Sequence, residues 1–198
     1  MNDSVLLKTN STGEKKILFS PRTGDELMKA TFHKIPLVMY SDLTKVAKRI
    51  GAVRAVAHMF KQSLQNIILL QNPSNMMSGH WLSVSCNPKR KEIYFFSTYG
   101  GKPDVEKIEW LKPKELEKSN QDINIFNDAL KVYQEKGWKI FYNDYPYQKK
   151  NDNTAVCGIY TVAFLRSNMN PDEFEDECKN IMKQGINPAI YFYEKYFC

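Results

Sequence analysis

The stretch IILLQNPSNMMSGHWLSVSCNPKRKEIYFFSTYGG, residues 67–101, decides the fold of this 198-residue chain. It opens with a short apolar run that stops at the turn-forming sequence NPS. Residues 81–86 then alternate between apolar and polar side chains, and residues 92–96 are rich in β-formers after the sequence NPKR. Alternation on either side of a short turn is typical of a β-hairpin. We therefore predict a strand over 66–70 and a hairpin joining 81–86 to 92–96.

Helical patterns flank this β-rich stretch on both sides. Helices are predicted over 25–33, 41–49, 54–65, 124–135 and 157–168 and from 171 and 187 onward, with extended segments over 35–40 and 138–142 and a small hairpin over 5–19. Ser41 is expected to cap its helix. A few strands with helices packed around them define an α+β fold with a small central mixed β-sheet. We expect residues 1–65 to pack as a helical and extended region on a core formed by residues 66–198.

Composition places the chain among ordinary globular proteins. Hydrophobic residues make up 42% of the sequence, charged residues 25% and aromatic residues 13%, which supplies enough apolar side chains for a sizeable core. No apolar run approaches the roughly 20 residues needed to cross a bilayer. The opening residues also lack the basic start and long apolar stretch of a signal peptide. We therefore expect no membrane partner and a cytosol-like compartment.

The net charge and the cysteine content limit which classes of partner and cofactor we expect. The net charge of +6 favours anionic partners such as nucleic acid, but the lysines are scattered, and a solubilising surface is the preferred explanation for them. The four cysteines are Cys86, Cys157, Cys178 and Cys198, and none forms a CxxC pair. No HxxxH pair is present either, so we expect free thiols and no zinc site.

Cys157 and Gly158 begin an apolar stretch with helical spacing. A thiol attacks only as thiolate, and a helix N-terminus supplies unpaired N–H groups and partial positive charge that favour the anion. Gly158 removes a side chain that would crowd an arriving peptide. The alternative is a buried cysteine that acts as a small apolar residue.

Three further features accompany the cysteine. His80 and Trp81 are placed at the start of a predicted strand, the next strand ends in the sequence FFSTYGG, and Gln148 lies in a polar loop before the cysteine. A glutamine amide can donate a hydrogen bond to the oxyanion formed when a carbonyl is attacked. Each feature alone is also explained as an ordinary surface or core residue.

The order of these motifs resembles the cysteine protease superfamily of adenovirus-type maturation proteases (adenain) and SUMO-deconjugating proteases. Residues 67–81 and the FFSTYGG turn are most similar to the enzymes of large DNA viruses, virophages and polinton-type elements. The resemblance covers residues 66–168. It implies an adenain-like, papain-related fold with Cys157 as nucleophile at the N-terminus of a buried helix, His80 as general base and Gln148 in the oxyanion hole.

Two positions depart from the family pattern. The strand after the histidine usually ends in an acid that orients the imidazole, and here Ser97 stands there. Ser97 can orient His80, Asp104 or Glu92 can reach in, or the enzyme can work as a Cys-His dyad; strand parity turns Glu92 the other way. Gln148 also precedes Cys157 by nine residues, a longer spacing than is usual, which leaves Asn151 and Asn153 as alternative amides.

The resemblance also implies a function. It predicts a viral endopeptidase that cleaves capsid or other virion precursors after small residues such as Gly-Gly or Gly-X-Gly, with Trp81 and Gly158 contacting the substrate. It predicts no required cofactor, DNA as an activator bound without sequence preference, a monomer, and a location in the virion and host cytoplasm. The alternatives are an isopeptidase acting on ubiquitin-like modifiers and a catalytically weak, DNA-binding virion protein.

Overall fold

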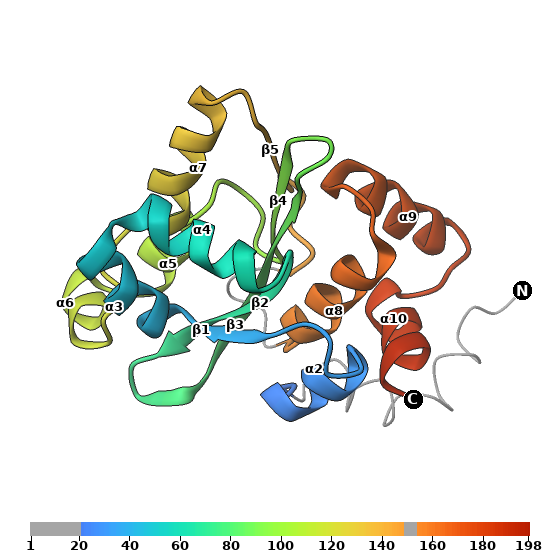
Figure 1. Ribbon diagram of the computed structural model, residues 1–198. Coiled ribbons are helices and arrows are strands. Elements are labelled where there is room, and N and C mark those ends of the chain that lie inside the picture. Colours follow the sequence, from blue (N-terminus) through green and yellow to red (C-terminus); the bar gives the residue numbers. More distant parts are fainter. Residues whose placement is uncertain (1–20, 149–153) are drawn as a thin grey trace, which may run out of the picture.

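One mixed sheet organises the computed structural model, which describes residues 21–148 and 154–198 (Figure 1). Within these residues the strands follow the order β1-β2-β3-β4-β5. They are β1 (Leu37–Met39), β2 (Gln65–Asn72), β3 (Asn75–Asn87), β4 (Glu92–Ser97) and β5 (Lys139–Tyr142). The two outer pairs, β1 with β2 and β4 with β5, are parallel, and the inner pairs are antiparallel. The predicted β3–β4 hairpin is confirmed.

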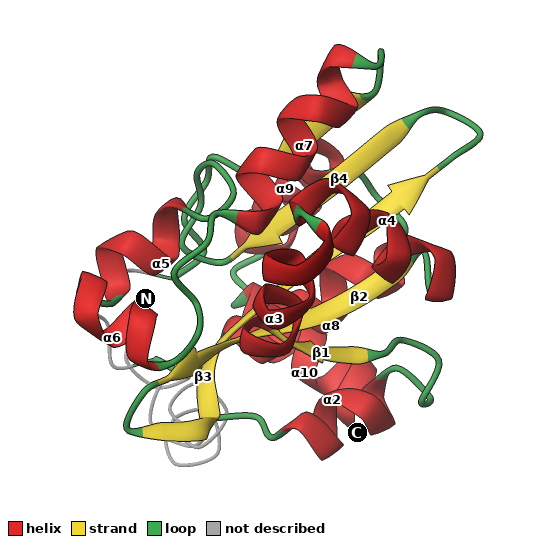
Figure 2. Cartoon of the chain, turned by 60° about the vertical axis from the view of Figure 1, so that its left-hand side comes forward, coloured by secondary structure: helices red, strands yellow, loops and turns green. Residues whose placement is uncertain are grey.

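Helices cover both faces of this sheet. They are α2 (Gly24–Ala30), α3 (Tyr40–Ile50), α4 (Ala52–Gln62), α5 (Val105–Trp110), α6 (Pro113–Lys118), α7 (Ile125–Glu135), α8 (Cys157–Ser167), α9 (Pro171–Lys183) and α10 (Pro188–Phe197). Helices α3, α4 and α7 share one hydrophobic core with the sheet, and α2, α8, α9 and α10 form cores on the other face. Figure 2 shows the sheet between these two groups. The α+β class with a mixed sheet flanked by helices is confirmed.

The position of β2 between two hydrophobic cores explains why residues 67–70 form a continuous apolar run. Ile68 and Leu70 face the core of α3, α4 and α7, whereas Ile67 and Leu69 face the core that contains α2 and α8. All four side chains are at most 1% exposed. A strand covered on both faces lacks the alternation of a half-exposed one, so β2 is a central strand of the structure.

Helix α8 is apolar on every side. Each residue from Cys157 to Leu165 is buried, as expected for a helix that runs through the interior rather than along the surface. Its second turn is tied to the sheet because Thr161 Oγ1 donates a hydrogen bond to the Trp81 carbonyl at 3.2 Å. The first residue of the helix therefore lies at the end of the sheet where β4 stops.

Several predicted boundaries are wrong. Helix α3 begins at Tyr40, so Ser41 is not its cap; its backbone N–H instead donates to Gln71 Oε1 at 3.1 Å. Helix α4 ends at Gln62 because the chain has turned into β2 by Gln65. Strand β3 starts well before His80, which is therefore inside the strand.

The structure also differs from the sequence prediction in the helices and in the region before residue 66. The short helices α5 and α6 were not predicted. Part of the region before residue 66 joins the main sheet through β1. The hairpin expected over 5–19 lies outside the described residues. In the described part of the chain, no helix is long and apolar enough to cross a membrane.

Gly79 allows β2 and β3 to pair directly before the histidine. A Cβ atom at this position would lie 2.0 Å from the Leu70 carbonyl oxygen, and its backbone φ is 158°. Real Cβ atoms do not approach backbone atoms so closely, and the partner here is main chain that cannot rotate away. Glycine is therefore required if the strand is to carry His80 at its observed position.

We expect Gly79→Ala to lower the free energy of unfolding by about 3 kcal/mol or more, because the new methyl group must push the two strands apart. Urea unfolding followed by circular dichroism measures this change. Gly185→Ala is the matched control, since φ is also positive there (75°) but no atom lies within 4 Å of the added Cβ; it should cost only about 1 kcal/mol. Equal losses in the two variants would contradict the steric explanation.

Candidate active site

The cysteine singled out by the sequence lies at the end of the sheet where β4 stops. Cys157 is the first residue of α8 and is 8% exposed. The backbone N–H groups of Trp81, Gly158 and Cys157 itself are directed at its sulfur. Since Trp81 directly follows His80 in β3, the thiol lies beside the strand residue next to the histidine.

The Cys157 thiol is buried yet surrounded by donors. Burial raises its pKa above the ordinary value, and the three backbone N–H groups lower it in part. Desolvation penalises the charged form, while N–H groups at a helix start stabilise it. The balance keeps a neutral thiol at rest, with donors already in place for a thiolate.

His80 is held by two contacts. Its Nε2 atom lies 2.9 Å from Ser97 Oγ, and its ring stacks on Tyr99 with 4.2 Å between ring centroids. The imidazole is only 2% exposed, and burial lowers its pKa to about 3. Burial also raises the pKa of Tyr99 to about 12, with a further contribution from the nearby Cys157. Tyr99 thus lies close to both the histidine and the cysteine.

The second ring nitrogen of His80 is left free. Among the described residues, Nδ1 has no hydrogen bond, and none joins the imidazole to the Cys157 thiol. The structure therefore gathers the two groups at one end of the sheet without a direct bond between them. In the tautomer whose Nε2–H donates to Ser97 Oγ, Nδ1 is the ring atom that can take a proton.

The candidates for orienting the imidazole are now separated. Ser97 contacts His80, whereas Asp104 accepts hydrogen bonds from the Tyr40 hydroxyl at 2.6 Å and from the Asn127 backbone at 2.9 Å. Glu92 lies at the opposite end of β4, where it is bonded to the hydroxyl of Tyr94 and paired with an arginine. Of these three side chains, Ser97 alone contacts the histidine.

An asparagine that the sequence did not single out fixes Ser97. Asn143 follows β5, and its side-chain oxygen accepts from the Ser97 backbone N–H at 3.0 Å. Its amide nitrogen donates to the Ser97 carbonyl at 2.7 Å. The side chain therefore continues the β4–β5 ladder past the last strand residue. In the sequence, the sign of this role was an asparagine placed directly after the predicted strand 138–142.

Gln148 is buried next to the segment that leads into α8. Its backbone N–H donates to the Thr98 carbonyl at 3.0 Å, and the Thr98 hydroxyl donates to its side-chain oxygen at 3.2 Å. Its amide nitrogen donates to the Thr154 carbonyl, so this donor is occupied at rest. Thr98 was not predicted to matter, although it orients the amide. Asn151 and Asn153 lie outside the described residues.

Trp81 and Gly158 differ in what they face. Trp81 is 4% exposed and donates from Nε1 to the Arg22 carbonyl at 3.0 Å. It lines a cavity of about 490 Å³ together with Gly79 and Trp110. The space beside Gly158 is instead filled by the protein itself, because a Cβ there would lie 3.0 Å from the Arg22 side chain. The absence of a side chain at Gly158 therefore allows close packing against Arg22, and the expected contact with a substrate stays a prediction.

Other chemistry at the site is limited. Within the described residues, no group of three or more histidine, cysteine or acidic side chains is arranged to hold a metal ion. All four cysteines are free thiols, as predicted. The described groups at this end of the sheet include a thiol, an imidazole and hydrogen-bond donors.

Comparison with known proteins adds a viral relative. No family model matches the chain, and no solved structure matches it. The chain is 33% identical over 89 residues to "Uncharacterized protein V9" of Sputnik virophage, an alignment that covers 44% of this chain and 47% of that protein. The chain thus spans about half the length of this relative. The similarity agrees with the viral origin that the motifs implied and names no activity.

Burial of His80 predicts a pH-dependent stability. Its pKa falls from 6.5 to about 3 on folding, so the unfolded chain binds more protons between these two values. The free energy of unfolding should therefore decrease as the pH drops from 6.5 to 3, by up to about 1.4 kcal/mol per pH unit from this residue. Urea unfolding at several pH values measures the slope.

The His80 contribution is the difference between wild type and His80→Gln. The carboxylates also titrate in this range, so only the part of the slope that disappears in the variant belongs to the imidazole. His58→Gln, which removes an exposed imidazole, is the matched control and should keep the wild-type slope. A slope unchanged in His80→Gln would show that the buried ring does not resist protonation.

Proposed function

We propose that this chain is a viral cysteine endopeptidase that cleaves capsid or other virion precursor proteins during particle maturation. One observation carries the proposal. A cysteine at the first position of a buried helix, with three backbone N–H groups directed at its sulfur, lies beside the strand residue next to a histidine whose Nε2 is fixed by Ser97. A nucleophile, a base and an orienting group in one place are the parts that acyl transfer requires.

In the proposed mechanism, His80 Nδ1 removes the Cys157 proton and the sulfur attacks the scissile carbonyl carbon. The carbonyl electron pair moves onto oxygen, which accepts hydrogen bonds from the Cys157 backbone N–H and the Gln148 amide. When the tetrahedral intermediate collapses, the imidazolium gives its proton to the departing amine and a thioester remains. Water, deprotonated by His80, then attacks the thioester and releases the acid product and the thiol.

Two movements accompany substrate binding in this scheme. The Gln148 amide must exchange the Thr154 carbonyl for the oxyanion. The His80 ring must come within hydrogen-bond reach of Cys157, which it can do by sliding beneath the stacked Tyr99 ring. Hydrogen bonds of this kind often tighten only when substrate is bound.

The substrate class rests on the family resemblance together with the local space. The cavity lined by Gly79, Trp81 and Trp110 includes the two residues that flank His80 in β3. Bulky walls next to the scissile bond favour substrates with small residues there, such as Gly-Gly or Gly-X-Gly. The adenain-like fold belongs to the same proposal, supported by a buried helix that starts at the nucleophile and by the antiparallel strands that carry His80 and Ser97.

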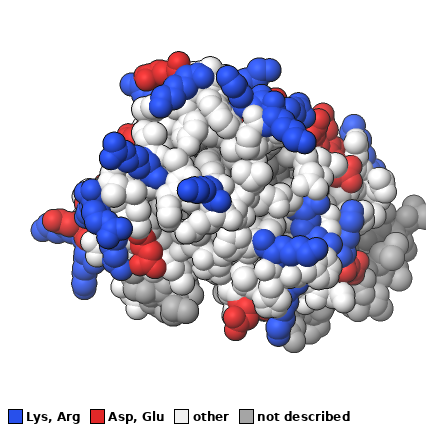
Figure 3. Space-filling view, viewed as in Figure 1, with Lys and Arg blue, Asp and Glu red and all other residues white. Residues whose placement is uncertain are grey.

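DNA is proposed as an activator that binds without sequence preference. The net charge of +6 supports this part of the proposal. Lysine and arginine side chains are also numerous on the face drawn in Figure 3. Phosphate contacts of this kind do not depend on base sequence.

A second candidate is a virion component with little catalytic activity. This candidate is supported by the charge state of the two groups at rest. Burial raises the pKa of the Cys157 thiol and lowers the pKa of His80, so both side chains are neutral. Ser97 adds no charge that would offset this effect. An isopeptidase acting on ubiquitin-like modifiers uses the same chemistry, and a panel of such fusions tested beside virion precursors separates it from the endopeptidase.

We expect Cys157→Ala to abolish cleavage of virion precursors co-expressed with the full chain, since the Cys157 thiol is the nucleophile of the proposed mechanism. Gel analysis of the precursors measures it, and Cys178→Ala is the control that keeps activity. Residual cleavage by Cys157→Ala would exclude the assignment. Iodoacetamide labelling at neutral pH separates the two candidates: an activated Cys157 reacts faster than the exposed Cys198, whereas slower labelling favours the virion component.

We expect Ser97→Asp to move the pH profile of Cys157 alkylation to lower pH. A carboxylate beside Nε2 stabilises the imidazolium and, through it, the thiolate. The alkylation rate near neutral pH should rise by about tenfold, equivalent to one unit in the thiol pKa. Ser97→Ala should move the profile the other way, and identical profiles in all three proteins would mean that Ser97 does not act on the pair.

A further inference from the structure

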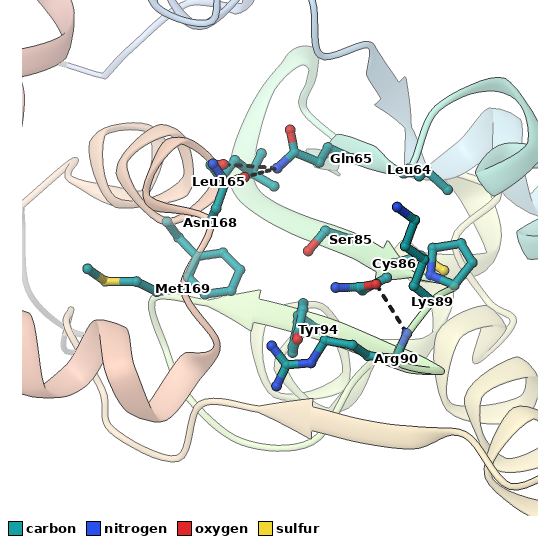
Figure 4. A pocket seen from close by; sticks show the side chains of 13 residues that line it. Leu64, Gln65, Ser85, Cys86, Lys89, Arg90, Tyr94, Leu165, Asn168 and Met169 are labelled. Atoms are coloured by element: carbon teal, nitrogen blue, oxygen red, sulfur yellow. Dashed lines mark hydrogen bonds between the residues drawn. The ribbon is translucent and has the colours of Figure 1, made fainter.

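A second pocket lies at the opposite end of the sheet from Cys157 and His80. Its volume is about 370 Å³, and its walls come from the start of β2, the β3–β4 turn and the end of α8. Figure 4 shows the side chains that line it. The proposed catalytic mechanism uses none of them.

The walls of this pocket are apolar on the α8 side. Leu165 and Phe164 are at most 2% exposed and form its floor, and Met169 and Tyr94 stand half-buried beside them. At the rim, Leu64 is 47% exposed. Apolar surface gathered in a concavity and reached by a partly exposed leucine is typical of a site that accepts an apolar side chain.

One polar side chain in the pocket lacks a partner. Ser85 is 7% exposed, and its hydroxyl makes no hydrogen bond with any described residue. Figure 4 shows this hydroxyl directed into the pocket from β3. The hydroxyl oxygen is not among the fully buried, unpartnered atoms of the described residues, so it stays open to the pocket and can hydrogen-bond to a polar group of a ligand.

The rim carries positive charge. Lys89 and Lys91 are exposed in the β3–β4 turn and pair with no acid among the described residues. Arg90 is exposed too, but its guanidinium already contacts Glu92 at 2.9 Å. Negative groups on a partner would therefore be attracted to the turn.

The end of α8 does not counter this charge. A helix C-terminus repels anions through its unpaired carbonyl groups. Here Ser167 Oγ donates to the Phe164 carbonyl at 2.8 Å, and Gln65 Nε2 donates to the Leu165 carbonyl at 3.0 Å. These two carbonyls have partners, and the Glu92 carboxylate beside Tyr94 is paired with Arg90. The exposed lysines of the turn therefore favour an anionic partner.

We propose that this pocket docks an acidic peptide segment of a partner protein, with one large apolar side chain against Phe164 and Leu165 and carboxylates beside Lys89. The volume fits one such side chain and adjoining main chain, whose carbonyl accepts from Ser85. Nucleic acid is disfavoured because its phosphates offer nothing to the apolar floor. The proposal does not depend on proteolysis, since every group that it uses lies outside the candidate active site.

The test uses the full chain and a fluorescein-labelled peptide, Glu-Asp-Leu-Phe-Glu-Asp, followed by fluorescence anisotropy. We expect saturable binding that Lys89→Glu weakens by about tenfold, the loss of one charge contact, and that Ser85→Ala weakens by a few-fold. The matched control is Lys114→Glu, an exposed lysine on α6, which should bind as the wild type does. Amide NMR shifts should change at residues 85–90 and 164–169.

Three outcomes would overturn the proposal. The first is equal binding of Lys-Lys-Leu-Phe-Lys-Lys, which would remove the charge argument. The second is tighter binding of a labelled oligothymidine that Lys89→Glu abolishes, which would assign the turn to nucleic acid. The third is peptide binding that is absent or equally weakened in both lysine variants. Because Cys157→Ala should bind the peptide normally, failure here is distinguishable from failure of the proposed protease.

Discussion

The contact between Trp81 and the start of α8 is the constraint on which the candidate site depends. The carbonyl of Trp81 accepts from Thr161, and its backbone N–H is directed at the sulfur of Cys157. Trp81 therefore fixes the position of α8 along β3 and the direction in which the helix runs. Because His80 is its neighbour in the same strand, the arrangement of thiol and imidazole follows from β3 itself, provided that Gly79 lets that strand pair closely with β2.

Much of the fold was predictable because its central part is local. The alternation in β3 and β4, the apolar run of β2 and the helical spacing of α8 each occupy one continuous segment, and all four were found. The misses have a different origin. Helices α5 and α6 are only six residues long, too short for periodicity to register. Ser41 has the right residue type for a cap, but Gln71, thirty positions away, takes its backbone N–H.

The residues of the candidate site also fall into those that local motifs mark and those that only the fold brings together. Cys157, His80 and Ser97 occupy positions that short motifs mark, so a sequence alone can nominate them. Asn143 and Thr98 act by bridging segments far apart in the chain, 46 positions between Asn143 and Ser97 and 50 between Thr98 and Gln148, and no local pattern announces such a pairing. Asp104 was left open as an acid for the histidine, and only the fold shows that it serves Tyr40 instead.

The burial of α8 on all sides has a consequence for the life of a newly made chain. Part of its cover comes from Phe174 and Phe192, which are translated after it and belong to α9 and α10. An apolar helix without that cover has no stable position in water. Burial of Val156 and Ile159, on either side of Cys157, is therefore completed only when α9 and α10 have been made and have packed against α8.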